Sequence, residues 1–165
     1  MTSTPRTGTR VVAIGLLSGA IVAAGMMLAP LAGNATTSYA QQVVALTNQQ
    51  RTAHGCGALT MDSALTNAAQ AHSAEMARYN YLSHTGRDSS SPATRISSTG
   101  YHYQSWGENI AAGYATPSAV VKAWMASPDH RANILNCKFH DIGVGYATNS
   151  SSTYHTYWTQ DFGSR

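Results

Sequence analysis

The chain has 165 residues and a low charge, with ten basic and seven acidic side chains giving a formal net charge of +3. Arg6 and Arg10 lie in the first ten residues, so residues 36–165 carry a net charge of only about +1. Since this later part has no cluster of Lys and Arg, we exclude nucleic acid as a partner. Its many Ser, Thr, Asn and Gln residues are typical of an extracellular protein.

The N-terminus has the order of an export signal: a basic start, an uncharged segment over residues 11–31, and then small residues. Gly33 and Ala35 satisfy the small-residue rule of a cleavage site, which predicts cleavage before Thr36, with a cut after Ala40 as the alternative. We therefore expect a signal peptide at residues 1–35, a single domain at residues 36–165, and a secreted, monomeric protein.

The uncharged segment is roughly 20 residues long, which is also enough to span a bilayer. An uncleaved anchor therefore stays open as an alternative, and it is the only membrane association that we expect. A lipid anchor is disfavoured, because Asn34 stands where lipidation needs a Cys thiol.

Two helices are predicted in the first half of the domain. The first covers residues 39–53 and ends at the glycine-containing turn 54–57. The second begins after the capping residue Asp62 and runs to about Tyr79, with its apolar residues at spacings of three and four. His72 lies on that apolar face, so we interpret it as a core histidine with a hydrogen bond inside the fold rather than as a ligand.

The chain has two cysteines, Cys56 and Cys137, and both follow the predicted cleavage site. Two lone cysteines in one small exported domain usually form a disulfide. The bond would close a loop of about 80 residues and stabilise the fold by a few kcal/mol. Two buried free thiols, or a pair of metal ligands, are the alternatives.

The second half changes from helices to strands. Residues 80–91 are predicted as a loop, followed by a short helix from Pro92 through Ile96 and a turn into residues 106–110. Thr116 is predicted to cap a further helix that Pro128 ends.

Alternating apolar residues at 142–146 and strand formers at 154–162 then predict a hairpin. Helices first and strands late predict an α+β domain, with helices covering an antiparallel sheet.

The sequence contains no Gly-x-Ser-x-Gly, phosphate-loop or His-Glu-x-x-His pattern. The polar residues that stand out lie at the edges of predicted elements. His84 follows a helix, Glu108 lies between Gly107 and Asn109 in an otherwise apolar stretch, and His130 follows the proline at 128.

Four motifs in this order resemble the CAP superfamily of SCP-like extracellular proteins, in its bacterial form. They are Gly-Glu-Asn-Ile-Ala at 107–111, Trp-Met-Ala-Ser-Pro-Asp-His-Arg-Ala-Asn-Ile-Leu at 124–135, Ile-Gly-Val-Gly-Tyr-Ala at 142–147 and Tyr-Trp-Thr-Gln-Asp-Phe-Gly at 157–163. With the helix that carries His72, the resemblance runs from about Tyr39 to Gly163. It implies an α-β-α sandwich with a cleft on one side.

The resemblance also implies a cleft with two His and two acidic residues. Carried over, these are His84, Glu108 and His130, while the fourth position holds Ser127 in place of a carboxylate. It implies a divalent cation such as zinc at His84 and His130, with Glu108 as a third ligand, an orienting partner or a base. The alternative is that Glu108 braces a loop by hydrogen bonding.

Three functions compete at this stage. The first is a binding protein for a lipid, a sterol, a cell-wall component or a protein, with Tyr101, Tyr103 and Trp106 as a candidate aromatic rim. The second is a metal-dependent peptidase or esterase with Glu108 and His130 as catalytic candidates, which the missing carboxylate at Ser127 disfavours. The third is a structural extracellular module without activity.

Overall fold

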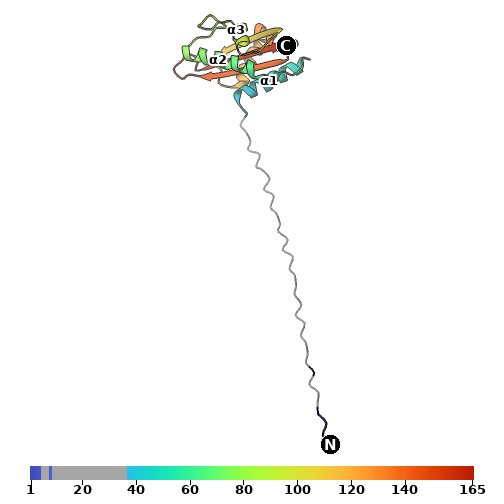
Figure 1. The fold of residues 1–165 in the computed structure, drawn as a ribbon. Coiled ribbons are helices and arrows are strands. Elements are labelled where there is room, and N and C mark those ends of the chain that lie inside the picture. Colours follow the sequence, from blue (N-terminus) through green and yellow to red (C-terminus); the bar gives the residue numbers. More distant parts are fainter. Residues whose placement is uncertain (5–7, 9–36) are drawn as a thin grey trace. The chain divides into compact units, whose positions relative to one another are not determined.

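The computed structural model describes residues 1–4, 8 and 37–165. The expected signal peptide, its cleavage site and the alternative of an uncleaved anchor fall almost entirely outside the described residues. In the part that is described, no helix is both long and apolar enough to cross a membrane. The domain that follows begins with α1 (Figure 1).

The domain contains five helices and four strands in its described residues. In chain order they are α1 (Tyr39–Ala53), β1 (Thr60–Met61), α2 (Ser63–Tyr79), α3 (Pro92–Ser98), β2 (Ser105–Ala112), α4 (Pro117–Ala126), α5 (Pro128–Ile134), β3 (Asp141–Thr148) and β4 (Thr156–Ser164).

The helix starts follow from local side-chain chemistry. Ser38 forms a capping box at α1, and the carboxylate of Asp62 accepts hydrogen bonds from two backbone N–H groups at the start of α2. Thr116 caps α4, with Pro117 at the first helical position. The predicted helices over residues 39–53, 63–79 and 92–96 and the helix after Thr116 are therefore confirmed.

Three elements were not predicted. No strand was assigned to the apolar stretch around Glu108, which forms β2. Pro128 follows α4 but also starts α5, because a proline needs no N–H partner in the first turn of a helix. The strand β1 has only two residues, too few for a sequence pattern.

The strands form one sheet in the order β1-β3-β4-β2. The predicted hairpin is confirmed as β3 and β4, and β2 pairs antiparallel with β4 along its whole length. The expected antiparallel pairing holds for β2, β3 and β4, and the two-residue edge strand β1 alone among the described strands runs parallel to its neighbour β3.

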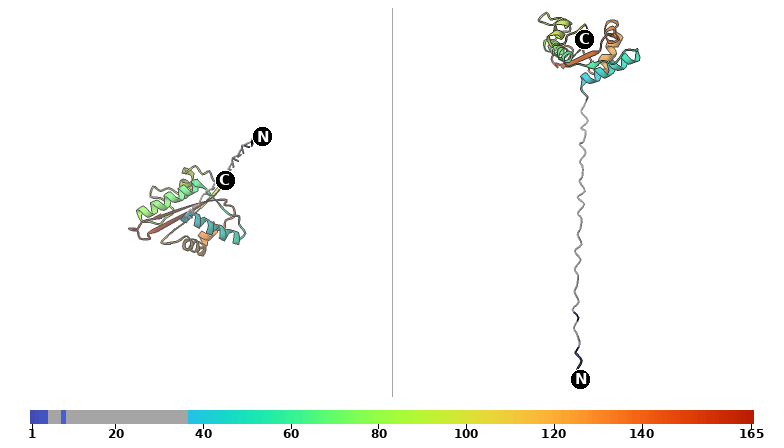
Figure 2. Two further views of the ribbon diagram at one scale, coloured as in Figure 1. Left: turned by 90° about the horizontal axis from the view of Figure 1, so that it is seen from below. Right: turned by 45° about the vertical axis from the view of Figure 1, so that its right-hand side comes forward.

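Helices cover both faces of the sheet, which gives the expected three-layer α-β-α arrangement. Figure 2 shows α2 on one side of the strands and α1 with the α4–α5 region on the other. The main core cluster lies on the α1 side, around Trp124, Trp158 and Phe162. On the α2 side, Leu65, Met76 and their neighbours form two smaller clusters.

Two glycines of β3 allow α2 to lie directly on the sheet backbone. A Cβ atom on Gly143 would overlap the backbone of Leu65, and one on Gly145 would overlap the backbone of Ala69. Any side chain at these positions would push α2 away from β3.

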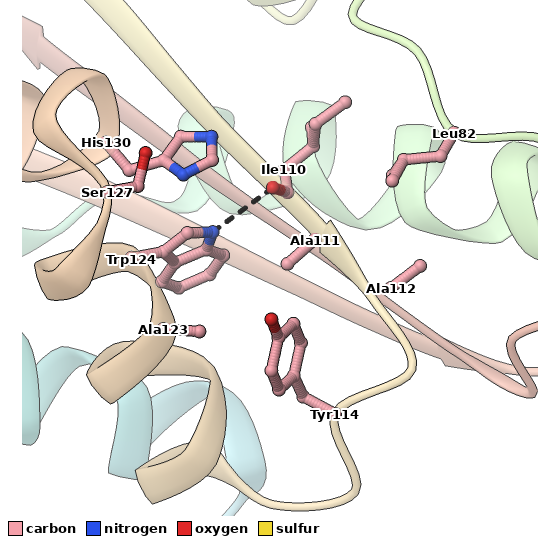
Figure 3. A pocket seen from close by; sticks show the side chains of 9 residues that line it. All are labelled: Leu82, Ile110, Ala111, Ala112, Tyr114, Ala123, Trp124, Ser127 and His130. Atoms are coloured by element: carbon pink, nitrogen blue, oxygen red, sulfur yellow. Dashed lines mark hydrogen bonds between the residues drawn. The ribbon is translucent and has the colours of Figure 1, made fainter.

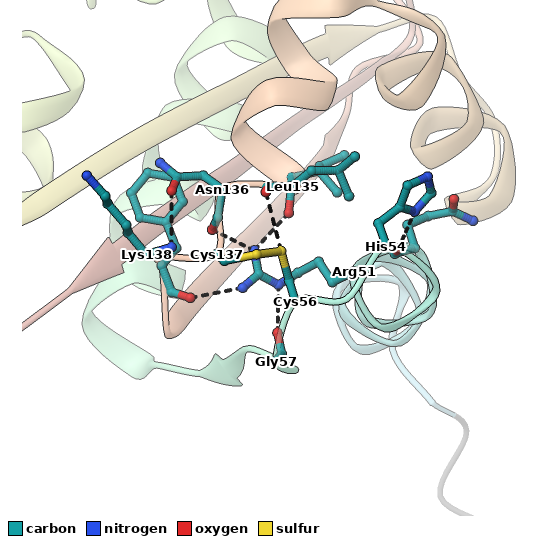
Figure 4. The surroundings of a disulfide bond; sticks show 11 residues. Arg51, His54, Cys56, Gly57, Leu135, Asn136, Cys137 and Lys138 are labelled. Carbon is teal, nitrogen blue, oxygen red and sulfur yellow. Dashed lines mark hydrogen bonds between the residues drawn. A yellow bond between two sulfur atoms is a disulfide. The ribbon is translucent and has the colours of Figure 1, made fainter.

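The disulfide between Cys56 and Cys137 is confirmed, with 5.0 Å between the Cα atoms (Figure 4). Beside it Arg51 is almost fully buried, at 1% exposure. Its guanidinium donates to the backbone carbonyls of Gly57, Ile134, Asn136 and Phe139 at 2.8–3.0 Å. The disulfide and Arg51 together tie the end of α1 to the segment between α5 and β3.

We predict that Gly143→Ala and Gly145→Ala each destabilise the protein by about 3 kcal/mol, because overpacking against backbone cannot be relieved by a rotamer change. Urea unfolding followed by circular dichroism measures the free energy. Gly57→Ala is the matched control, since a Cβ there would have no neighbour within 4 Å. Equal stability of all three variants would contradict the proposed packing.

Candidate functional site

The carboxylate of Glu108 is the centre of the site. Its side chain is only 1% exposed, and both oxygens have a partner. Oε1 lies 2.6 Å from Nδ1 of His84, and Oε2 accepts a hydrogen bond of 2.6 Å from Nη2 of Arg95. The loop after α2, the helix α3 and the strand β2 therefore meet at one buried carboxylate.

His84 is brought to Glu108 by the buried histidine of α2. Nε2 of His72 lies 2.8 Å from the backbone carbonyl of Ser83, the residue before His84. A carbonyl only accepts, so Nε2 carries the hydrogen. Burial lowers the pKa of His72, with the positive charge of Arg95 as the next cause, which favours the neutral ring. His72 is thus a hydrogen-bonded core residue, as interpreted from the sequence.

Asn109 fixes the position of His130 from the opposite face of β2. Its Nδ2 donates to the backbone carbonyl of His130 at 3.0 Å and to Oε1 of Gln160 at 3.1 Å. Its Oδ1 accepts from Nδ2 of Asn133 at 2.9 Å, and Gln160 in turn donates to Thr47 at 2.8 Å. Asn109 therefore holds α5 against the sheet.

His84 and His130 differ in their surroundings. The His84 side chain is 51% exposed and hydrogen-bonded at Nδ1, which leaves Nε2 free of that contact. Burial lowers the pKa of His130, and the charge of His84 lowers it further, while Asp129 raises it. No hydrogen bond joins the two rings in the described part of the chain.

Asp161 is a second acid near Glu108 that sequence reasoning missed. It lies opposite Glu108 in the register of β2 and β4 and is 1% exposed. Burial and the negative charge of Glu108 raise the pKa of Asp161 well above its ordinary range. Its neutral form is therefore favoured beside the ionised pair of Glu108 and Arg95.

Arg95 was also missed, because nothing in the local sequence marks an arginine in a short helix as the partner of a residue on a distant strand. The three aromatic residues expected as a rim do not line the groove beside His130. Tyr101 is buried, with its hydroxyl donating to Asp141 at 2.7 Å, while Tyr103 and Trp106 pack edge to face.

The described residues contain no group of three or more His, Cys, Asp or Glu side chains placed to hold a metal ion. Glu108 has both oxygens occupied by His84 and Arg95. In this arrangement it is placed as the partner that orients the His84 ring, which is how carboxylates commonly act beside metal-binding histidines.

A groove of about 270 Å³ adjoins His130 (Figure 3). Ser127 and His130 form the polar end of the groove, and Ala123 and Trp124 of α4 form one wall. Two residues from loops also line it: Leu82, after α2, and Tyr114, between β2 and α4. Three consecutive residues of β2 complete the lining: Ile110, Ala111 and Ala112. Ser127 and His130 thus belong to the groove lining, whereas Glu108 and His84 do not, and most of the groove is apolar.

We predict that Arg95→Met destabilises the protein by about 3–5 kcal/mol, because it leaves the buried carboxylate of Glu108 without its cationic partner. Chemical denaturation measures the loss. Arg87→Met is the control, since Arg87 is exposed and its side chain only lies over the ring of Tyr79. A loss no larger than that of the control would show that Glu108 does not depend on Arg95.

We also predict that His72 and His130 titrate below the ordinary histidine value of 6.5. Because the pKa values of His72 and His130 are lower in the folded state, the unfolded chain binds more protons than the folded protein once the pH falls to about 6.5. The free energy of unfolding should therefore decrease as the pH falls through this value. Imidazole NMR titration measures the pKa values. His72→Gln should flatten the pH dependence of stability, whereas His102→Gln, at an exposed position, should leave it unchanged.

Comparisons with known proteins identify the family and the fold of the domain. The model of the "Cysteine-rich secretory protein family" (CAP) matches residues 44–162. The "Uncharacterized protein YkwD" of Bacillus subtilis (strain 168) is 43% identical over 131 residues, which are 79% of this chain and 49% of that protein. The "Uncharacterized membrane protein YlbC" of the same organism is 33% identical, over 76% of this chain and 34% of that protein. The chain thus spans half or less of the curated relatives that it matches.

A solved structure described as an extracellular protein containing a SCP domain, from Bacillus anthracis str. Ames, superimposes with a TM-score of 0.70 and 32% identity. It covers 77% of this chain, which matches 40% of that one. An outer surface protein from Borrelia burgdorferi, at 22% identity, shares the fold with a TM-score of 0.67 over 74% of this chain and 90% of that one. From the family match over residues 44–162, together with the shared fold, the chain belongs to the CAP family of cysteine-rich secretory proteins.

Proposed function

We propose that this chain is an exported CAP domain that binds a ligand of the cell envelope or its surroundings in the groove beside His130. The observation that carries the proposal is the state of Glu108. The Glu108 carboxylate is 1% exposed and contacts both His84 and Arg95, so it links the loop after α2 and the helix α3 to β2. Since both of its oxygens are occupied, neither is free to act as a base for water. We therefore favour binding over the alternative of a peptidase or esterase.

The groove supports this proposal by its composition. Apolar side chains with a few polar groups at one end are the usual lining of a ligand site. Here Ser127 and His130 supply the polar end, and the ligand classes expected from the sequence are a lipid, a sterol, a cell-wall component or a protein segment. Export is supported by the signal-like sequence before residue 36 and by the extracellular description of the Bacillus anthracis structure.

Metal binding is a second candidate function, favoured by the orientation of His84. With Nδ1 bonded to Glu108, Nε2 is left as the nitrogen that could hold a divalent cation such as zinc, and His130 would be the second ligand. Such a cation would supply a Lewis acid at the polar end of the groove. Two protein ligands are fewer than the three of a typical catalytic zinc site, so we expect an exchangeable ion.

Filling the groove should abolish ligand binding. We predict that Ala123→Trp weakens binding at least about tenfold because the indole occupies the space of the ligand, whereas Ala126→Trp, on the exposed side of α4, does not. Phospholipid, sterol, muropeptide and peptide probes are titrated against each protein and followed by NMR. Binding that is equal in both variants would place the ligand elsewhere, and no binding by any probe would contradict the proposed function.

Zinc titration by calorimetry tests the second candidate. His84→Ala and His130→Ala should each remove most of the affinity, and Glu108→Gln should lower it about 10–100-fold by releasing the His84 ring. His102→Ala is the control, because His102 is exposed and lies outside the groove lining. If neither cleft histidine changes the zinc affinity, the metal site and any metal-dependent reaction are both ruled out.

A further inference from the structure

The groove beside His130 lies at the outer edge of the sheet. Successive side chains of a strand point to opposite faces, so three consecutive residues can line one cavity only where that cavity straddles the strand edge. Ile110 packs with the cluster under α2, and Ala111 packs with the cluster under α4. Since β2 is the last strand in the order β1-β3-β4-β2, its outer edge faces the groove.

The register of β2 shows which backbone groups point into the groove. The N–H of Gly113 donates to the carbonyl of Thr156, the residue that lies opposite it when the β2–β4 register is continued past Ala112. Because hydrogen-bonded pairs alternate along antiparallel strands, the odd-numbered residues of β2 are the ones that exchange hydrogen bonds with β4. Even-numbered residues then point their N–H and C=O groups outward. Two side chains confirm this direction independently: Asn133 donates to the carbonyl of Glu108 at 3.1 Å, and Trp124 donates to the carbonyl of Ile110 at 3.2 Å.

The protein thus covers one half of this edge and leaves the other half open. Asn133 and Trp124 occupy the outward carbonyls of Glu108 and Ile110. Within residues 37–165, no hydrogen bond partner is found for the N–H of Ile110 or for the N–H and C=O of Ala112. Unpaired backbone groups at a sheet edge are a template for another extended chain.

We propose that the outer edge of β2 at Ile110–Ala112 pairs with a short extended peptide segment, which would lie as an added strand between β2 and α4. The proposal rests on the ligand-binding role of this groove and names its ligand class. Ala112 would exchange two hydrogen bonds with one peptide residue, and the N–H of Ile110 would donate to a further peptide carbonyl.

The carbonyls of Glu108 and Ile110, which already accept hydrogen bonds from Asn133 and Trp124, limit the length and register of this pairing. A peptide N–H cannot reach the carbonyl of Ile110 while Trp124 occupies it, so the added strand ends near the polar groups of Ser127 and His130. Neighbouring peptide side chains would point to opposite faces, one toward Leu82 and one toward Ala123. Since both walls are apolar, we expect small or aliphatic side chains at these two positions.

A lipid chain fits the same walls less well. It would cover the N–H and C=O of Ala112 and remove them from water without offering a donor or an acceptor, and buried backbone groups without partners are costly. A peptide satisfies these groups and the apolar walls together.

The test is an NMR titration of the isotope-labelled full chain with an N-acetylated, C-amidated pentapeptide of Val and Leu flanked by Ser. Ala112→Pro removes the outward N–H but no bond to β4, and proline is accepted at such edge positions. Ala112→Ser keeps the N–H and is the matched control. A peptide N-methylated at its central residue tests the same pairing from the ligand side, and sodium dodecanoate serves as the lipid-like probe.

We expect the pentapeptide to shift the amides of Ile110 and Ala112, and to bind Ala112→Pro about tenfold more weakly than Ala112→Ser. We expect a similar loss for the N-methylated peptide with the unchanged protein, a readout that holds even if Ala112→Pro does not fold. Equal affinity of the methylated and unmethylated peptides would overturn strand pairing. Groove shifts with dodecanoate alone would overturn it while leaving the proposed function intact, and shifts with neither probe would count against both.

Discussion

The close contact between α2 and β3 is the constraint on which the rest of this structure depends. Gly143 and Gly145 leave no atoms between the helix and the strand backbone, so α2 lies at a fixed height and rotation over the sheet. That placement aims His72 at the carbonyl of Ser83. The loop after α2 is thereby held down, and His84 reaches Glu108. The packing of α2 on β3 in the core thus determines where the exposed side chain of His84 lies.

The buried carboxylate of Glu108 is stabilised by partners from two separate segments. An ionised carboxylate in the protein interior requires a cation and hydrogen bonds, which Arg95 and His84 supply at 2.6 Å each. Asp161, beside it in the sheet, cannot share that cation equally and is favoured in its neutral form. The Glu108 carboxylate therefore links α3 to β2, and neither of its oxygens is without a partner.

Asn109, the neighbour of Glu108, acts on the other face of the same strand. Since successive side chains of β2 alternate, Glu108 faces α2 and α3 while Asn109 faces α5 and holds the backbone of His130. One short motif therefore organises both sides of the sheet. The groove lies where this organisation ends, at the part of the β2 edge that α4 and α5 leave uncovered.

The sequence alone predicted the α+β class, the main helices, the β3–β4 hairpin and the pairing of Cys56 with Cys137. Caps, periodicity and the presence of just two cysteines are local or compositional signals. It also identified Glu108, through its motif. It did not identify Arg95 or Asp161 as partners of that carboxylate, since both meet it only through tertiary packing and strand register.

The strands β1 and β2 and the helix α5 were likewise decided by tertiary structure. A two-residue strand has no period of its own, and Pro128 is as suited to starting a helix as to ending one. The open half of the β2 edge is of the same kind. Which backbone groups point outward depends on the pairing of β2 with β4, and which of them stay free depends on where Trp124 and Asn133 lie in space.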